Sequence, residues 1–251
     1  MKPYSSFASV YDRLMEETPY ESWEKWLQKV FVKETISSPA ILDVGCGTGT
    51  ILNKLLKKGF KAAGNDLSED MLAAAKYKLN SQGFDPLLFC QDMRKLDIPM
   101  KFDVILVLCD SLNYLTKEAD VAEAFQSFYS HLNDDGFLIF DVHSLFYVEN
   151  ILHGFSFADT SEDVSYIWNA FSTEHKGEVE HELTLFIERE NSIYERHDEF
   201  HVQKTFSVEE YKRLLKVSNF EVSGVYSDFS FSPPQDKSER IFFIAKKVLH
   251  Y

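Results

Sequence analysis

The sequence contains little cysteine and no long apolar run, and both shortages exclude classes of protein. Its three cysteines, Cys46, Cys90 and Cys109, are too few and too scattered for a disulfide framework or a CxxC metal site. No stretch approaches the roughly 20 apolar residues that a membrane-spanning helix needs. The N-terminal residues also lack the apolar segment of a secretory signal. These absences predict a cytoplasmic protein with no membrane partner.

Basic residues are also scarce. Lysine and arginine number 26 against 40 aspartates and glutamates, so the formal net charge is −14. No basic run is longer than a pair such as Lys57-Lys58. Nucleic acids and anionic membrane surfaces bind clustered basic side chains, and an acidic protein repels them at long range. The sequence therefore predicts no nucleic-acid partner.

Apolar residues are abundant, at 45% of the chain with 15% aromatic, which suffices for the core of one domain with an insertion. After an N-terminal stretch of about 35 residues with helical spacing, strand-like and helical segments alternate five times. The expected strands are 40–44, 60–66, 86–92, 102–110 and 136–142, and two more close the chain at 220–231 and 240–248. This alternation is typical of an α/β fold with a doubly wound, mostly parallel sheet.

Residues 144–205 break this rhythm. The segments 179–190 and 193–206 alternate polar and apolar residues without a helix between them. The Asn191-Ser192 pair that joins them predicts an antiparallel hairpin. We therefore expect an antiparallel β insertion within a main domain made of residues 1–143 and 206–251.

A glycine-rich loop, DVGCGTG at 43–49, joins the first expected strand to the helix after it. Glycine lets a backbone turn tightly and lets a ligand approach it closely, and the N-terminus of the helix offers free amide groups. A second acidic residue, Asp66, ends the next strand, where a carboxylate can accept hydrogen bonds from ribose hydroxyls. A solvated turn aspartate is the alternative for Asp66 alone. Together the two features predict a cofactor that contains ribose.

The loop pattern D-x-G-x-G-x-G resembles that of the class I S-adenosylmethionine-dependent methyltransferases. Dehydrogenases that bind nicotinamide usually show G-x-G-x-x-G instead. The resemblance covers residues 40–143 and 206–251. It implies a seven-stranded Rossmann-like sheet, S-adenosylmethionine as cofactor and methyl transfer to a small molecule. A nicotinamide-dependent oxidoreductase, and a protein that binds the cofactor without transferring a methyl group, are the alternatives.

The same resemblance implies cofactor contacts in the loop. Gly45, Gly47 and Gly49 would pass beneath the cofactor, and Cys46 lies between the first two of them. Asp43 would organise the loop near the methionine amino group. These roles come from the family's pattern and not from the composition of the chain.

Further family positions concern the ribose and the adenine. Asp66 would hold the ribose, with Leu67 beside it. Met71 resembles the residue that packs on the adenine, although its spacing equally suits a core methionine. Asp92 and Met93 match a pair in which the carboxylate meets the adenine amino group and the next backbone unit meets the ring.

Two other regions would meet the methionine portion. Cys109 lies near the end of the fourth strand, where the family's backbone contacts it. The N-terminal stretch YSSFASVYDRLM resembles a subgroup of small bacterial methyltransferases, in which a helix with a Tyr-Asp pair covers the cofactor. This likeness places Tyr11, and Tyr4 with it, at the methionine end. The alternative is that both rings pack the first helix onto the sheet.

The acceptor is expected beyond the carboxyl ends of the strands, where open α/β sheets bind ligands. Those ends supply Tyr114 after the fourth strand and His143 after the fifth, and the insertion would cover them as a lid. Alignment and desolvation are the main requirements of methyl transfer. His143 is the leading candidate base, followed by His201 and Tyr114. The lid and the N-terminal pair resemble sugar-amine and glycine N-methyltransferases, which favours an amine among N- and O-nucleophiles.

His197, Glu199 and His201 alternate and so share one face of a strand. A metal site, polar contacts to the acceptor and a solvated face are the three interpretations. Neighbouring positions on such a face lie roughly 6.6 Å apart by strand rise, which is awkward for a single ion. We therefore expect no metal.

Overall fold

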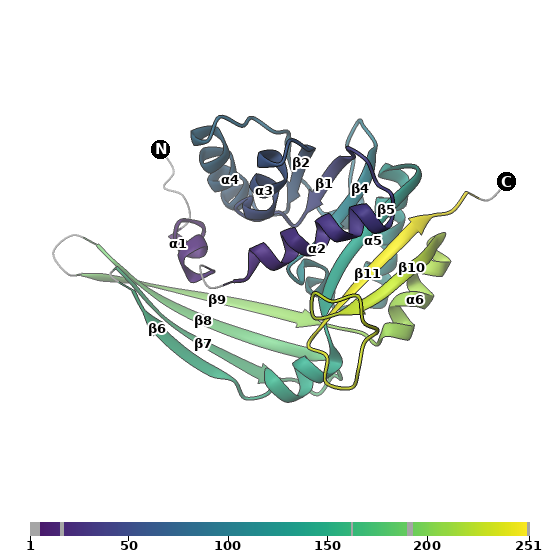
Figure 1. The fold of residues 1–251 in the computed structure, drawn as a ribbon. Coiled ribbons are helices and arrows are strands. Elements are labelled where there is room, and N and C mark those ends of the chain that lie inside the picture. Colours follow the sequence, from purple (N-terminus) through teal and green to yellow (C-terminus); the bar gives the residue numbers. More distant parts are fainter. Residues whose placement is uncertain (1–5, 16–17, 162, 190–192, 250–251) are drawn as a thin grey trace.

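The computed structural model describes residues 6–15, 18–161, 163–189 and 193–249, which form two β-sheets and their helices (Figure 1). The larger sheet has the strand order β10-β11-β5-β4-β1-β2-β3. Its strands are β1 (Ala40–Val44), β2 (Lys61–Asp66), β3 (Leu88–Cys90), β4 (Phe102–Val107), β5 (Leu132–His143), β10 (Phe220–Ser227) and β11 (Arg240–Lys247). β11 pairs antiparallel with β5 and β10, and the other neighbours are parallel. The predicted doubly wound α/β fold is confirmed.

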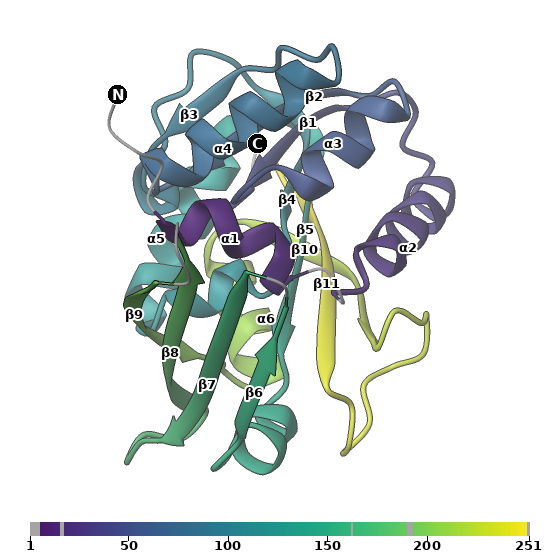
Figure 2. The ribbon, with the colours of Figure 1, turned by 90° about the vertical axis from the view of Figure 1, so that its left-hand side faces the viewer.

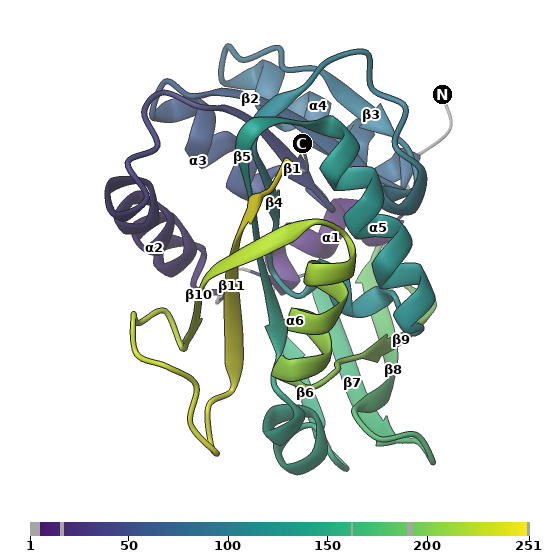
Figure 3. The ribbon, with the colours of Figure 1, turned by 90° about the vertical axis from the view of Figure 1, so that its right-hand side faces the viewer.

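Helices cover both faces of this sheet, as Figure 3 shows for α2 on one side and α5 and α6 on the other. The helices are α2 (Tyr20–Lys33), α3 (Thr50–Lys57), α4 (Glu69–Ser81), α5 (Glu118–His131) and α6 (Val208–Val217). The side chains of β4 alternate between the two helical layers. Val104 and Leu106 pack in the cluster with α2 and α3, whereas Ile105 and Val107 pack in the cluster with α5 and α6. A strand buried on both faces is apolar throughout. Among the described residues, no helix is both long and apolar enough to cross a membrane.

The helix boundaries follow from local capping. The Ser68 hydroxyl accepts a hydrogen bond from the Met71 amide at the start of α4. Ser207 and Glu210 form a reciprocal capping box at the start of α6. Gly59, with φ of 84°, ends α3 in the left-handed conformation that glycine adopts without strain. In all three cases the residue type at the helix end explains where the helix begins or ends.

The fourth strand is shorter than predicted. β4 ends at Val107 and not at residue 110, because Cys109 and Asp110 adopt left-handed φ values of 55° and 53°. Their amides donate to the carboxylate of Asp141 on β5, at 2.9 and 3.2 Å. These two hydrogen bonds to a side chain of the neighbouring strand accompany the turn of the backbone. The apolar pattern of the sequence, in contrast, predicts that the strand continues to residue 110.

Two other strands also end early. β3 covers three residues and not 86–92, because it pairs with β2 alone and Pro86 has no amide hydrogen to donate. β10 stops at Ser227, where the expected strand continued to 231. The next two residues, Asp228 and Phe229, have left-handed φ values of 52° and 58° and turn the chain.

The insertion forms the second sheet, with the order β6-β7-β8-β9 and antiparallel pairing throughout. A π-helical turn, η3 (Tyr147–Ile151), precedes β6 (Ser156–Thr160), β7 (Val164–Ser172), β8 (Glu178–Glu188) and β9 (Tyr194–Lys204). The pairing of β8 with β9 confirms the predicted hairpin, and its turn at Asn191-Ser192 lies outside the described residues. The sequence pattern did not predict β6, because all of its residues are exposed and no alternation marks it.

Candidate active site

The glycine loop between β1 and α3 has a backbone that requires glycine. Gly45, Gly47 and Gly49 have φ values of 70°, 53° and 77°. A Cβ at Gly45 would lie 2.7 Å from the side chain of Ser111, and one at Gly49 would lie 3.2 Å from that of Ala75. A Cβ at Gly47 would meet nothing within 4 Å. The middle glycine thus presents its backbone to open space, which fits a cofactor lying across the loop.

Asp43 lies beneath this loop and is 2% exposed. The Leu52 amide in the first turn of α3 donates to its carboxyl group, whereas Oδ2 has no hydrogen-bond partner among the described residues. Burial raises the pKa of Asp43 to about 7, and the charge of Asp66 adds to the shift. A buried carboxyl oxygen without a partner fits the cationic methionine end of the cofactor. The role that the resemblance implies stays a prediction.

Asp66 ends β2 with its carboxylate turned toward the glycine loop. Oδ2 accepts from the Gly47 amide at 2.8 Å, and Oδ1 accepts from the Ser68 amide at 2.9 Å. Each carboxylate oxygen retains a lone pair for a ribose hydroxyl. Leu67 beside it is 73% exposed, so this apolar side chain is available to a ligand. The ribose assignment stays a prediction.

The residues predicted to hold the adenine have different surroundings. Asp92 already accepts hydrogen bonds from Arg94, which lowers the pKa of its carboxyl group. Met93 packs against the core cluster of α5 and α6. Met71 is half-buried and is not among the described residues packed on the core clusters. Met71 is therefore accessible to a ligand, and the contacts of both methionines with adenine stay predictions.

The thiols of the two cysteines predicted to contact the cofactor, Cys46 and Cys109, are largely shielded from solvent. A Cβ added to Gly64 would lie 2.9 Å from the Cys46 sulfur, so this thiol points into β2 and away from the loop's open side. Cys109 donates its amide to Asp141. Burial raises the thiol pKa of Cys46 and of Cys109. Neither thiol is therefore an activated nucleophile.

α1 (Ser6–Leu14) lies between the two sheets and spans the space from the glycine loop to the insertion (Figure 2). Tyr11 forms a hydrogen bond with Tyr20, and burial raises its pKa. Asp12 accepts from Thr48 in the glycine loop and from Lys78 on α4, the latter at 2.6 Å. Sequence reasoning missed Lys78. Tyr4, the other predicted ring, lies outside the described residues.

The far end of α1 meets the insertion. Val10 is fully buried in a cluster with Val164 and Leu185 of the second sheet. Arg13 forms an ion pair with Asp163, just before β7. The helix therefore contacts both the predicted cofactor loop and the predicted lid.

His143 lies at the carboxyl end of β5. Its Nε2 is 3.4 Å from Oδ2 of Asp110, and its ring stacks on Tyr147 with centroids 4.7 Å apart. Asn113 accepts from the His143 amide at 3.0 Å and donates to the Lys204 carbonyl at 2.8 Å. The end of β9 is thus joined to the end of β5 beside the candidate base.

Asp110 is the centre of a network that sequence reasoning did not assemble. Arg240 at the start of β11 donates to Asp110 Oδ1 at 3.0 Å and also bonds Asp141. Its guanidinium lies 4.8 Å from the Trp23 ring, whose Nε1 donates to Asp141. Burial alone would raise the pKa of Asp110, but His143 and Arg240 outweigh it and hold that pKa well below its usual value. Two separate features of the sequence indicate this network. One is the acidic residue Asp110 at the end of an expected strand, and the other is Arg240 at the start of the last expected strand.

Tyr114 and His201 meet across the two sheets. Their ring centroids are 5.9 Å apart in an edge-on arrangement. Tyr114 is 50% exposed, yet partial desolvation raises the pKa of its hydroxyl, and the negative charges of Asp110, Asp66 and Glu199 raise it further. Burial lowers the pKa of His201, although Glu199 acts in the opposite direction. The structure therefore brings all three candidate bases to the same end of the sheet, and their catalytic roles stay predictions.

Metal binding receives no support from the arrangement of side chains. Among the described residues, no group of three or more histidines, cysteines, aspartates or glutamates could hold an ion. His197 interacts with Glu195, 3.2 Å away, on its own strand.

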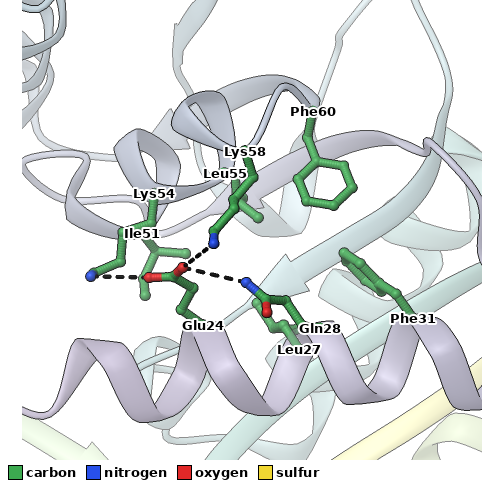
Figure 4. Close-up of a pocket in the computed structure, with 9 residues that line it drawn as sticks. All are labelled: Glu24, Leu27, Gln28, Phe31, Ile51, Lys54, Leu55, Lys58 and Phe60. Atoms are coloured by element: carbon green, nitrogen blue, oxygen red, sulfur yellow. Dashed lines mark hydrogen bonds and ion pairs between the residues drawn. The ribbon is translucent and has the colours of Figure 1, made fainter.

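Two cavities lie apart from the glycine loop. The first, between α2 and α3, holds about 10 Å³ and is bridged by Glu24, which bonds Lys54 and Lys58 (Figure 4). This is about the smallest space that can hold one water molecule. The second measures about 580 Å³ and lies at the C-terminal end of β9, where its lining includes Lys204 and Glu210. Neither contains the glycine loop or a candidate base.

Comparison with known proteins agrees with this geometry. A family model described as a methyltransferase domain matches residues 41–136. The YqeM protein of Bacillus subtilis (strain 168) is 43% identical over 97% of each chain. The crystal structure of an S-adenosylmethionine-dependent methyltransferase from Clostridium acetobutylicum ATCC 824 superposes with a TM-score of 0.86 and 30% identity, covering 97% of this chain and 98% of that one.

More distant relatives differ in their acceptors. One is a dTDP-3-amino-3,4,6-trideoxy-α-D-glucopyranose N,N-dimethyltransferase of Streptomyces venezuelae, 34% identical over half of each chain. Another is a malonyl-[acyl-carrier protein] O-methyltransferase of Priestia megaterium, 41% identical over 27% of this chain and 24% of that one. The comparisons do not support the nicotinamide alternative. With its glycine loop, strand order and full-length relatives, the chain belongs to the class I S-adenosylmethionine-dependent methyltransferases.

Proposed function

We propose that the protein methylates an amine of a small molecule, with His143 as the proton acceptor. The observation that carries the choice of an amine is the negative charge around Tyr114. Asp66, Asp110 and Glu199 all lie near enough to raise the pKa of its hydroxyl. A cationic amine is attracted to such a site, whereas an anionic carboxylate acceptor is repelled.

The arginine of the site does not reverse this preference. The Arg240 guanidinium is shared between Asp110 and Asp141, so these three groups together remain negative. Glu199 on β9 contributes a further negative charge, which acts on both Tyr114 and His201. The amino-sugar methyltransferase among the distant relatives acts on an amine and supports the proposal.

His143 is suited to take the proton that an amine loses on methylation. If Nε2 carries a proton and donates to Asp110, Nδ1 is left as the acceptor of a neutral ring. Bound S-adenosylmethionine supplies an electrophilic methyl group. The chain's residues then need to hold the amine in line, exclude water and accept one proton. We assign the exclusion of water to residues 144–205, acting as a lid.

We also propose a cytoplasmic setting. Cys46, Cys90 and Cys109 are all free thiols. Disulfides are rare in the reducing cytoplasm, so the free thiols agree with this location. Fractionation of cells that express the protein tests it.

Release of S-adenosylhomocysteine from a panel of acceptors tests the function. The panel contains glycine, D-glucosamine and spermidine as amines, and malonate and succinate as carboxylates. We expect turnover with at least one amine and none with the carboxylates. Turnover confined to carboxylates would overturn the proposal.

His143→Ala tests the base with the best amine of the panel. A positioned general base contributes about 10²- to 10⁴-fold, so kcat should fall by about 100-fold or more while cofactor affinity is kept. His153→Ala is the matched control, because His153 is exposed at the root of the insertion. Equal activity of the wild type and His143→Ala would remove His143 from the mechanism.

A further inference from the structure

A chain of hydrogen-bonded polar groups runs from the insertion to the candidate base. Trp168 on β7 donates its Nε1 hydrogen to Nδ1 of His181 on β8, at 3.0 Å. The side chains of His181 and Gln203 are hydrogen-bonded to each other. Gln203 on β9 donates Nε2 to Oδ2 of Asp110, at 3.0 Å. Three strands of the second sheet thus contribute to one contact with the main sheet.

The direction of each hydrogen bond is set by chemistry. An indole nitrogen only donates, so Nδ1 of His181 must accept. Burial lowers the pKa of His181 to about 4, so the ring is neutral near pH 7 and carries its hydrogen on Nε2. This hydrogen can donate to the Gln203 carbonyl oxygen, which leaves the Gln203 amide nitrogen to donate to Asp110.

Each member of the chain depends on the next. His181 and Gln203 are 7% and 6% exposed. A buried polar group without a partner loses its hydration without compensation, so the chain resists rearrangement. The orientation of the Gln203 amide is therefore determined by His181 and, through His181, by Trp168.

Asp110 divides its two oxygens between the sheets. Oδ1 accepts from Arg240, which belongs to the main sheet. Oδ2 accepts from Gln203 of the insertion and is also the oxygen that faces His143 Nε2, 3.4 Å away. The lid and the candidate base thus share a single oxygen atom.

We propose that Gln203, oriented by His181 and Trp168, is a positioning residue that fixes the Asp110 carboxylate against His143. The inference rests on the proposed function, because it assigns His143 the role of base. The lid then does more than exclude water: docking of β9 supplies the last hydrogen bond that orients the base. A molecule with an open lid would have a poorly oriented His143.

The charged and titratable groups around His143 define the expected pH effect. They are Asp110 after β4, Arg240 on β11, His181 on β8 and Tyr147 on η3. Gln203 is neutral, and its amide hydrogen offsets part of the negative charge on Asp110 Oδ2. Its loss would therefore change both the position and the effective charge of the carboxylate that faces His143.

Gln203→Met tests the inference, because it removes both amide hydrogen bonds and keeps a similar side-chain length. We expect kcat for the active amine to fall by about tenfold, part of a general base's contribution, with cofactor affinity unchanged. The pH–rate profile of the variant should differ from that of the wild type. Val202→Ala is the matched control, since Val202 is the neighbouring residue on the outer face of β9 and is 42% exposed.

Trp168→Phe provides a second, gentler variant that leaves Gln203 in place. If the three residues act as one chain, adding Trp168→Phe to Gln203→Met should reduce kcat no further, because coupled residues are not additive. If the two substitutions reduced kcat multiplicatively, the inference that the three residues act as one hydrogen-bonded chain would be overturned. Should Gln203→Met fail to fold, Trp168→Phe alone should still lower kcat and change the pH–rate profile.

The outcomes separate this inference from the proposed function. An inactive His143→Ala together with a fully active Gln203→Met of unchanged pH profile would overturn the positioning role alone. A fully active His143→Ala would overturn the proposed base itself.

Discussion

Asp66 is the residue on which cofactor affinity should depend most directly. Its carboxylate retains lone pairs for ribose hydroxyls beyond its bonds to the Gly47 and Ser68 amides. A hydrogen bond to a charged group contributes about 1.5–3 kcal/mol, so Asp66→Ala should weaken S-adenosylmethionine binding by about 10- to 150-fold. Isothermal titration calorimetry measures the change.

Asp70→Ala is the control for Asp66, because Asp70 is an exposed aspartate in the first turn of α4. S-adenosylmethionine should raise the melting temperature of the wild type and of this control, whereas NADH should raise neither. Unchanged affinity in Asp66→Ala would remove Asp66 from the ribose site.

Asp43 should make cofactor binding depend on pH. Burial raises its pKa to about 7, so near and below that pH the carboxyl group of the free protein holds a proton. A cationic ligand favours the carboxylate, so binding below pH 7 must release this proton. Affinity should therefore fall by up to about tenfold for each pH unit below 7 and level off above it.

Calorimetry from about pH 5.5 to about pH 8.5 checks this dependence, because a group with a pKa near 7 titrates within that range. Asp43→Asn cannot titrate, and its weaker binding should be nearly independent of pH. A wild-type affinity that does not change across this range would contradict the placement of a cofactor cation beside Asp43.

At the scale of elements, the insertion and α1 are the parts that complete the site. The glycine loop and Asp66 lie outside residues 144–205, and α1 is tied to the loop through Asp12 and Lys78. Replacing residues 144–205 with a short linker should therefore abolish turnover while cofactor binding persists. Both are measured on the same preparation, by product release and by calorimetry.

The control for this replacement is a shortened loop at 233–237, between β10 and β11 and remote from the candidate bases in sequence. It should keep full activity. If the protein without residues 144–205 folds and still methylates its substrate at the wild-type rate, the assignment of the insertion as a lid is wrong.

At the scale of the whole molecule, we expect catalysis without a metal. Metal-assisted methyl transfer to catechols needs several convergent oxygen ligands. Here Asp110 and Asp141 are engaged by Arg240 and by backbone amides. Alignment by hydrogen bonds and desolvation should suffice, so activity should be complete in excess EDTA.

Elemental analysis of the purified protein and assays with and without chelator check this expectation. Loss of activity in EDTA that magnesium restores would contradict the metal-free mechanism. An acceptor that chelates through two oxygens would then replace the amine.

Local patterns in the sequence predicted the fold and the glycine loop well, because they report local backbone geometry. Glycine at 45, 47 and 49 anticipates three left-handed φ values. Ser68, and Ser207 with Glu210, anticipate hydrogen bonds that span three residues. Such features are determined within a few residues of chain, so the helix ends and the expected cofactor loop follow from the sequence. The ends of β3, β4 and β10, and the whole of β6, do not.

The tertiary structure alone decided which polar groups share the acceptor side of the site. Asp110 meets Gln203 and Arg240, which follow it by 93 and 130 residues. The antiparallel insertion of β11 beside β5, and the docking of β9 against the loop after β4, bring them together. No local pattern encodes these pairs, because each bond depends on strand order and on the burial of both partners. The sequence by itself determined the family and its cofactor, and the packing of the two sheets determined the surroundings of the base.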